Sequence, residues 1–150
     1  MSVPSRMSSR KRKETRMLFK VDLITYKGIY RTIETEKLNV PTSEGRRTIL
    51  SNHMPIMMPL AMGVIETSKN GKLSHFAVNN GIMYFESNQA AIIADSVLDV
   101  DDIDIPRAIA DRDRALKGIE SARNEVELSR ATFKKEVAEN FLSAAEKYLK

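Results

Sequence analysis

Two arginines in the last third of the chain have the type and the spacing needed to hold an anion. Arg107 and Arg114 are seven residues apart in the segment IDIPRAIADRDRA, and two helical turns bring such positions back to nearly the same angle. A pair of guanidinium groups can grip a polyphosphate through charge-assisted, forked hydrogen bonds. The small side chain of Ala108, beside the first arginine, would let a ligand approach the helix closely.

The same segment also fits an ordinary solvated helix face. Arg107 and Asp111, and Asp111 and Arg114, stand at the spacings of helical ion pairs, which contribute only about 0.2–0.5 kcal/mol each. Residue spacing alone therefore leaves both interpretations open.

The helix that carries these arginines is expected to begin near Ile105. The acidic segment 99–104, DVDDID, places negative charge ahead of the helix N-terminus, where the helix dipole favours it, and Pro106 suits the first turn. Lys117 and Gly118 predict a last turn followed by a left-handed C-cap. The apolar positions of this helix form one stripe, made of Ile105, Ile109, Leu116 and Ile119.

A second helix follows, because Asn124 and Glu127 have the spacing of a capping box. Its apolar stripe is Val126, Phe133, Val137, Phe141 and Tyr148. Two amphipathic helices predict an antiparallel hairpin over residues 103–150. In the connection KGIESARN only Gly118 opposes a continuous helix, and an interior glycine costs about 1 kcal/mol relative to alanine. We therefore expect Gly118 to act as a hinge at which the hairpin can open.

Residues 17–102 show a different pattern, in which apolar and polar residues alternate and turn residues interrupt each run. The runs include LFKVDLITY, GKLSHFAV, IMYFES and AAIIA, and turns are expected at Lys27-Gly28, at Asn79-Asn80-Gly81 and at Ser87-Asn88. Many short strands of this kind predict a sandwich or a barrel. Because an alternating strand buries one face, two such sheets must cover each other. The expected fold is an all-β sandwich domain followed by the helical hairpin.

The positive charge of the chain belongs to its first residues. The net charge is +4, and residues 1–16 alone carry +5, which leaves the remainder at −1. Residues 1–16 are polar and have no apolar face, so we expect a disordered basic tail. A nucleic-acid-binding β-barrel with such a tail is the alternative function. It is disfavoured because the rest of the chain carries no net positive charge and the segment VNNGIMYFES offers few exposed-looking aromatic residues for base stacking.

The residues that most catalytic and metal sites require are scarce. The sequence contains no cysteine, only two histidines, His53 and His75, and no GxxxxGK[ST] phosphate-binding loop. We therefore find no catalytic constellation of these kinds, and we expect no metal site and no required cofactor.

Several segments, taken in order, resemble one known family. The opening strand is FKVDLITYKGIY, the segment VPTSEGRRTILSNHMPIMMPLAMG resembles the pattern GxxGILPxHxP, and VNNGIMYFE resembles VxGGFxxV. AAIIADSV is similar to the last strand of that family, and a two-helix C-terminus follows. Over residues 17–150 the chain is similar to the epsilon subunit of the bacterial F-type ATP synthase, although Thr48 and Ser51 replace a usual glycine and proline.

The resemblance implies a non-catalytic part of the rotor in the central stalk. The sandwich would couple the gamma subunit to the c-ring, and the opened C-terminal helices would enter the catalytic alpha/beta head and inhibit ATP hydrolysis. It also implies a peripheral location on the cytoplasmic face of the cell membrane, reached only through the complex, and no nucleic-acid partner.

The resemblance also implies roles for particular residues. His53 would face gamma, and Glu44 and Gly45 would lie in the turn that approaches the c-ring. The segment IDIPRA fits the family's ATP-binding pattern I/L-D-x-x-R-A, so a regulatory ATP would be bound by Ile103, Asp104, Arg107 and Ala108, with Arg114 as the second arginine. In the opened state, acidic segments of the catalytic beta subunits would meet Arg123, Arg130, Lys134 and Lys135.

Overall fold

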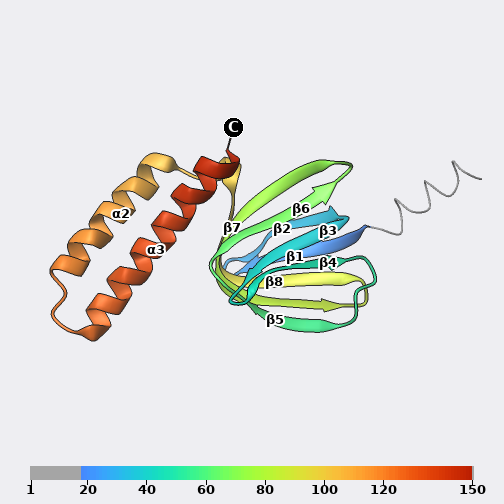
Figure 1. The fold of residues 1–150 in the computed structure, drawn as a ribbon, viewed down its shortest axis with the longest axis horizontal. Coiled ribbons are helices and arrows are strands. Elements are labelled where there is room, and N and C mark those ends of the chain that lie inside the picture. The colour runs from blue at the N-terminus through green and yellow to red at the C-terminus, as the bar shows by residue number, and fades with distance from the viewer. Residues whose placement is uncertain (1–17, 150) are drawn as a thin grey trace, which may run out of the picture.

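The computed structural model describes residues 18–149 and contains a β sandwich followed by two helices (Figure 1). The strands are β1 (Phe19–Thr25), β2 (Gly28–Thr35), β3 (Lys37–Thr42), β4 (Gly45–Leu50), β5 (Ile56–Leu60), β6 (Gly63–Lys69), β7 (Lys72–Glu86) and β8 (Gln89–Asp99). A short 3₁₀ turn, η1 (Val100–Asp102), leads to α2 (Ile105–Glu120) and α3 (Glu125–Tyr148). The predicted fold class is confirmed, and the basic tail expected at 1–16 lies outside the described residues.

The sheet is built from alternating strands, as the sequence predicts. In β1 the side chains of Phe19, Val21 and Leu23 are buried, while Lys20 points to solvent. The strand order is β2-β1-β8-β7-β6-β3-β4, with β5 paired to β7. All the pairs are antiparallel except β1 with β8, which is parallel.

Strand β7 is a single bent strand, so the turn expected at Asn79-Asn80-Gly81 is wrong. Its first half pairs with β6 and its second half with β5, while β8 runs along both. Asn80 takes a φ of 45° at the bend, a conformation that asparagine tolerates better than most residues. A Cβ on Gly81 would lie 2.5 Å from the carbonyl oxygen of Ile93, so this position must lack a side chain. Ser87 and Asn88 do form the turn predicted there, both with positive φ.

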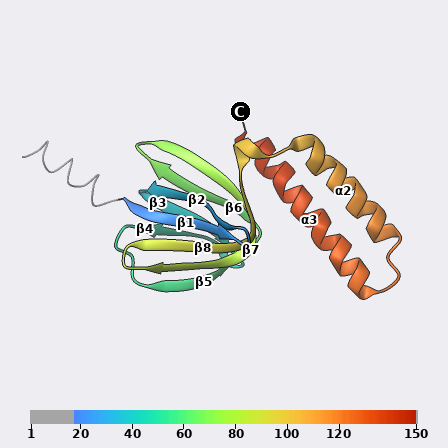
Figure 2. The same cartoon turned by 180° about the vertical axis from the view of Figure 1, so that it is seen from behind.

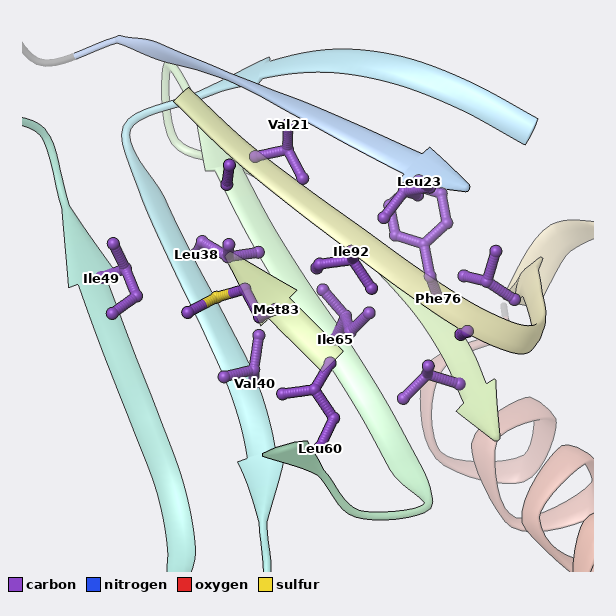
Figure 3. Packing of buried hydrophobic residues seen from close by; sticks show 14 of the residues in the cluster. Val21, Leu23, Leu38, Val40, Ile49, Leu60, Ile65, Phe76, Met83 and Ile92 are labelled. Atoms are coloured by element: carbon purple, nitrogen blue, oxygen red, sulfur yellow. The ribbon is translucent and has the colours of Figure 1, made fainter. Parts of the chain in front are cut away.

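The main core lies between the strands, where apolar side chains from several strands converge (Figure 3). Leu38, Ile65, Phe76, Met83 and Ile92 are each at most 1% exposed. Burial of such side chains stabilises the sandwich by about 25 cal/mol per Å² of apolar surface removed from water. No residue of α2 or α3 belongs to this core cluster.

The two helices pack through alanines and not through the predicted stripes of large apolar residues. Ala108 and Ala115 of α2 are buried, as are Ala131 and Ala138 of α3. Each pair is seven residues apart and so lies on one helix face, and small side chains let the helix axes approach closely. The stripe residues Ile109, Leu116 and Phe133 keep 39%, 42% and 37% of their surface exposed.

Gly118 is an ordinary residue of α2, which corrects the predicted left-handed C-cap. The helix continues to Glu120 and is capped by Ser121. A Cβ on Gly118 would lie 3.3 Å from the Cβ of Ala131, so Gly118 belongs to the close contact between the helices. The reversal of the chain is completed by Asn124, whose side chain accepts a hydrogen bond from the Glu127 amide as predicted.

Candidate functional site between the hairpin and the sandwich

The hairpin projects away from the sandwich and touches it mainly through the last turns of α3 (Figures 1 and 2). This contact is an apolar cluster separate from the main core. We call it the docking cluster, and its buried members are Val64, Ala77, Val100, Ile103, Ala144 and Ala145, with Phe141, Tyr148 and Leu149 partly buried around them. Ile103 of the predicted ATP motif is thus a packing residue, 8% exposed.

Two specific contacts accompany the docking cluster. Asn140 of α3 donates from Nδ2 to the carbonyl oxygens of Gly63, at 3.1 Å, and Val78, at 3.3 Å. The ring of Tyr148 stacks on the ring of His75 with 3.8 Å between centroids and an interplanar angle of 17°. The His75 ring is held in place on the sandwich, because its Nε2 lies 2.9 Å from a carboxylate oxygen of Glu66.

Beside the docking cluster a groove of about 700 Å³ opens between α2, α3 and the bend of β7. Arg114 of α2 and Arg130 and Lys134 of α3 supply its positive charges, and Asp111 and Glu127 supply negative ones. Its apolar wall consists of Phe133, Val137 and Phe141 together with alanines, and Asn79 of β7 lines it from the sandwich side. The groove is therefore an amphipathic site, and its charged side chains, three cations and two carboxylates, all belong to the hairpin.

The structure divides the residues of the predicted ATP motif. Asp104 is the N-cap of α2 and accepts a hydrogen bond from the Arg107 amide at 3.1 Å, while Ala108 is buried, at 5% exposed. Arg114 lines the groove and pairs with Asp111 at 3.2 Å. Arg107 shares this helix face by its spacing but is not among the residues that line the groove.

The residues expected to contact other subunits lie at the two ends of one strand. Glu44 lies in the turn before β4, where its amide donates to Thr42 Oγ1 at 3.2 Å. Gly45 is the first residue of β4 and takes a φ of 111°. His53 lies in the loop after β4, and its Nδ1 donates to the carbonyl oxygen of Met54 at 2.8 Å. The structure therefore separates these two predicted contacts by the length of the strand.

The segment that joins the sandwich to the hairpin is anchored by charge. Arg31 of β2 lies 2.5 Å from a carboxylate oxygen of Asp99 and 3.6 Å from one of Asp102. The Tyr30 hydroxyl donates to Asp102 and accepts from the Asp99 amide. Burial raises the pKa of Tyr30, and the hydrogen bond to Asp99 raises the pKa of Arg31. These contacts hold the segment up to Asp102 against the sandwich.

Comparison with known proteins decides the family. The model of the ATP synthase delta/epsilon chain β-sandwich domain matches residues 18–100. A curated ATP synthase epsilon chain of Lactobacillus gasseri is 34% identical over 138 residues, which is 87% of this chain and 94% of the relative. The chain belongs to the epsilon-chain family of F-type ATP synthases. Its resemblance to the bacterial form is confirmed.

Further relatives of the family agree. The ATP synthase epsilon chain of Lacticaseibacillus casei is 36% identical over 75% of this chain and 80% of the relative. Among solved structures, a chain of the Euglena gracilis mitochondrial ATP synthase assembly of OSCP, F1 and c-ring superposes with a TM-score of 0.71 at 16% identity, over 85% of this chain and 81% of that one. At that identity the superposition speaks for the fold alone.

In this epsilon-family chain the positive residues of the expected inhibitory helix are available for contacts. Arg123, Arg130 and Lys134 are exposed and Lys135 is half-buried. Within residues 18–149 none of the four forms an ion pair. Arg130 and Lys134 share a helix face and enter the groove, a second location that sequence reasoning did not assign to them.

The described part of this family member shows two further absences. Over residues 18–149, no three His, Cys, Asp or Glu side chains come together in a way that could hold a metal ion. Neither α2 nor α3 is apolar enough over sufficient length to cross a membrane.

Proposed function

We propose that this epsilon-family subunit belongs to the rotor of the synthase, couples gamma to the c-ring through its sandwich, and restrains ATP hydrolysis through its hairpin. The observation that carries the proposal is the separation of the two apolar clusters. The hairpin can leave the sandwich by opening the docking cluster, while the main core of the sandwich stays closed. In this proposal the docked and the opened hairpin are the two states that a brake requires.

The coupling role rests on an exposed apolar face of the sandwich. Met57 of β5 stands opposite Tyr84 of β7, and Ile82 of β7 stands opposite Ile93 of β8. Met57 is 62% and Tyr84 43% exposed, and a contiguous apolar patch of this kind marks an interaction surface. We propose gamma as its partner, with His53 nearby in sequence and the Glu44-Gly45 turn directed to the c-ring.

The description of a further structural neighbour supports a place in the central stalk. A chain similar in fold belongs to an assembly described as the central stalk and c-ring of the Tetrahymena thermophila mitochondrial ATP synthase, with a TM-score of 0.52 and 15% identity over 84% of this chain and 95% of that one. In a bacterial cell the proposed location is the cytoplasmic face of the membrane, through the complex only. Co-purification tests the coupling: recovery of gamma supports it, while recovery of RNA without gamma supports the nucleic-acid-binding alternative.

We further propose that ATP binds the docked hairpin at the groove. The cations of Arg114, Arg130 and Lys134 suit its phosphates, and Arg107 lies on the same face of α2, nearer the sandwich. Bound ATP would stabilise the docked form by RT ln(1 + [L]/Kd) and so release the brake.

Removal of the Arg114 guanidinium is expected to weaken ATP binding. Arg114→Ala should cost about 1.5–3 kcal/mol of binding free energy, the range for a lost charge-assisted hydrogen bond. Arg112→Ala is the matched control, because Arg112 is on the same helix, pairs with Asp113 at 3.4 Å and does not line the groove. Calorimetry with the full chain measures both. The groove is not the ATP site if the two variants lose the same affinity.

Loss of the two specific docking contacts is expected to release the hairpin. The double variant Asn140→Ala with Tyr148→Ala removes the bridge to two strand carbonyls and the stack on His75, together about 1–3 kcal/mol. Amide hydrogen exchange in α3 should accelerate, and the assembled enzyme should hydrolyse ATP more slowly. Glu139→Ala, an exposed neighbour, is the control. Unchanged exchange in the double variant would show that these two contacts do not hold the hairpin and that the rest of the docking cluster does.

A further inference from the structure

One buried polar group in the groove has no hydrogen-bond partner within residues 18–149. Asn79 is 6% exposed, and its Oδ1 accepts no hydrogen bond. It stands in the middle of β7, directly before the bend at Asn80 and opposite Ser96 of β8. It is also the residue through which the sandwich lines the groove.

An unpaired amide is an unusual group to keep at such a position. A buried polar atom without a hydrogen bond destabilises the fold, whereas an apolar side chain of similar size avoids the penalty. The neighbouring lining residues on α3, Val137, Ala138 and Phe141, are themselves apolar. Packing alone would therefore favour leucine over asparagine here, and the amide calls for a partner from outside the chain.

The groove has three chemically distinct parts. An amide stands at the sandwich and apolar side chains form the wall. On the hairpin stand the cations Arg114, Arg130 and Lys134, which outnumber the carboxylates of Asp111, paired with Arg114, and Glu127. A matching ligand has a flat ring with hydrogen-bonding groups at one end and several negative charges at the other. An adenine nucleotide has this form.

We propose that Asn79 recognises the adenine base of the bound nucleotide and selects ATP over GTP. An asparagine amide can accept from the adenine N6 amino group and donate to N7, forming a bidentate pair. Guanine presents two acceptors, O6 and N7, on the same edge, so the amide oxygen would face an acceptor. This inference rests on the proposed ATP site and adds to it the residue that sets base specificity.

The location of Asn79 also explains how ATP would distinguish the two states of the hairpin. The amide belongs to the sandwich and the cations belong to the hairpin, so the site is complete only while the hairpin is docked. A ligand shifts a conformational equilibrium only by its differential affinity for the two states. ATP that spans both units binds the docked state alone and thereby favours it.

The test is calorimetry of the full chain with ATP and with GTP, for the unmodified protein, Asn79→Leu and the control Ser96→Ala, which alters the residue paired with Asn79. The unmodified chain and the control are expected to bind ATP about tenfold or more tightly than GTP. Asn79→Leu should lose about tenfold in ATP affinity and bind both nucleotides equally. Its melting temperature without nucleotide should not fall, because an unpaired buried oxygen has been removed.

The outcomes separate this inference from the proposed function. If the unmodified chain binds neither nucleotide, both the ATP site and the role of Asn79 are overturned, while the coupling role stands. If it binds ATP and Asn79→Leu leaves the ratio of ATP to GTP affinity unchanged, only the role of Asn79 is overturned. If Asn79→Leu melts at a lower temperature, Asn79→Ser replaces it, and a retained preference for ATP in that variant overturns the inference.

Discussion

Reversing three positive charges on α3 is expected to abolish inhibition of ATP hydrolysis by the assembled enzyme. The variant replaces Arg130, Lys134 and Lys135 by glutamate. In the proposed inhibited state these cations face acidic segments of the catalytic subunits, and like charges placed opposite each other cost on the order of several kcal/mol. ATP hydrolysis should therefore rise, while binding to gamma through the sandwich stays unchanged. High salt should weaken inhibition by the unmodified chain in the same direction.

Whether ATP hydrolysis rises or falls in this variant separates two roles of Arg130 and Lys134, the contact with the catalytic subunits and the binding of ATP. Arg130 and Lys134 also line the groove, so the variant is expected to lose ATP as well. Loss of ATP alone would favour the opened, inhibiting form and lower hydrolysis, which is the opposite result. The matched control reverses three exposed lysines of the sandwich, Lys20, Lys69 and Lys72, and should leave inhibition intact. A fall in hydrolysis with the α3 variant contradicts the charge contact.

A leucine at position 118 is expected to deepen inhibition. Gly118 is helical in the docked hairpin, and its missing Cβ would already lie 3.3 Å from the Cβ of Ala131. Helix propensity therefore does not distinguish the two states, because Gly118 would be helical in both. Steric crowding does distinguish the two states, because Gly118→Leu forces α2 and α3 apart only in the docked hairpin. The cost there is about 1–3 kcal/mol. This cost shifts the equilibrium between the docked and the open hairpin toward the open form by roughly 5- to 150-fold.

A smaller side chain at position 118, and a leucine elsewhere on α2, test whether crowding between the helices causes the effect. Gly118→Ala should give a smaller shift in the same direction, because only Ala131 must move by a few tenths of an ångström. Ala110→Leu, at an exposed position of the same helix, adds the same bulk away from α3 and should leave ATP hydrolysis unchanged. Equal inhibition with Gly118→Leu and Ala110→Leu would contradict the role of the close contact.

The strands and the helix starts could be predicted because their signals are local. Alternation in β1 identified Phe19, Val21 and Leu23 as inward-facing, and they are buried. The capping-box spacing of Asn124 and Glu127 marked the start of α3. These signals depend on one strand or one turn, so neighbouring elements cannot override them easily.

The contacts between elements were less predictable, because they depend on partners distant in sequence. Amphipathic periodicity favoured the large residues Leu116 and Phe133 as the helix interface, yet buried Ala115 and Ala131 form it. A row of alanines gives no strong hydrophobic signal on its own and becomes an interface only when two such rows meet. The bend of β7 was not predicted for a related reason. Asparagine and glycine at 79–81 are compatible both with a turn between two strands and with a bend inside one strand.

In the candidate site, too, the roles of some residues could be predicted from the sequence and the roles of others could not. The sequence identified Arg114, and the structure places it in the groove. Asp104 and Ala108 proved to have structural tasks, as an N-cap and as a packing residue. Asn79 could not be recognised from the sequence, because its burial depends on α3, which comes more than 40 residues later in the chain.

The most direct test of the proposed brake is the rate of ATP hydrolysis by the assembled enzyme with the full chain and with residues 103–150 deleted. The main core contains no residue of α2 or α3, so the shortened chain should retain its sandwich and its place beside gamma. The account predicts faster ATP hydrolysis with the shortened chain, and a rate that no longer responds to substitutions in the hairpin. An equal rate with both chains, at equal occupancy of the complex, would contradict it and leave the protein as a structural coupler alone.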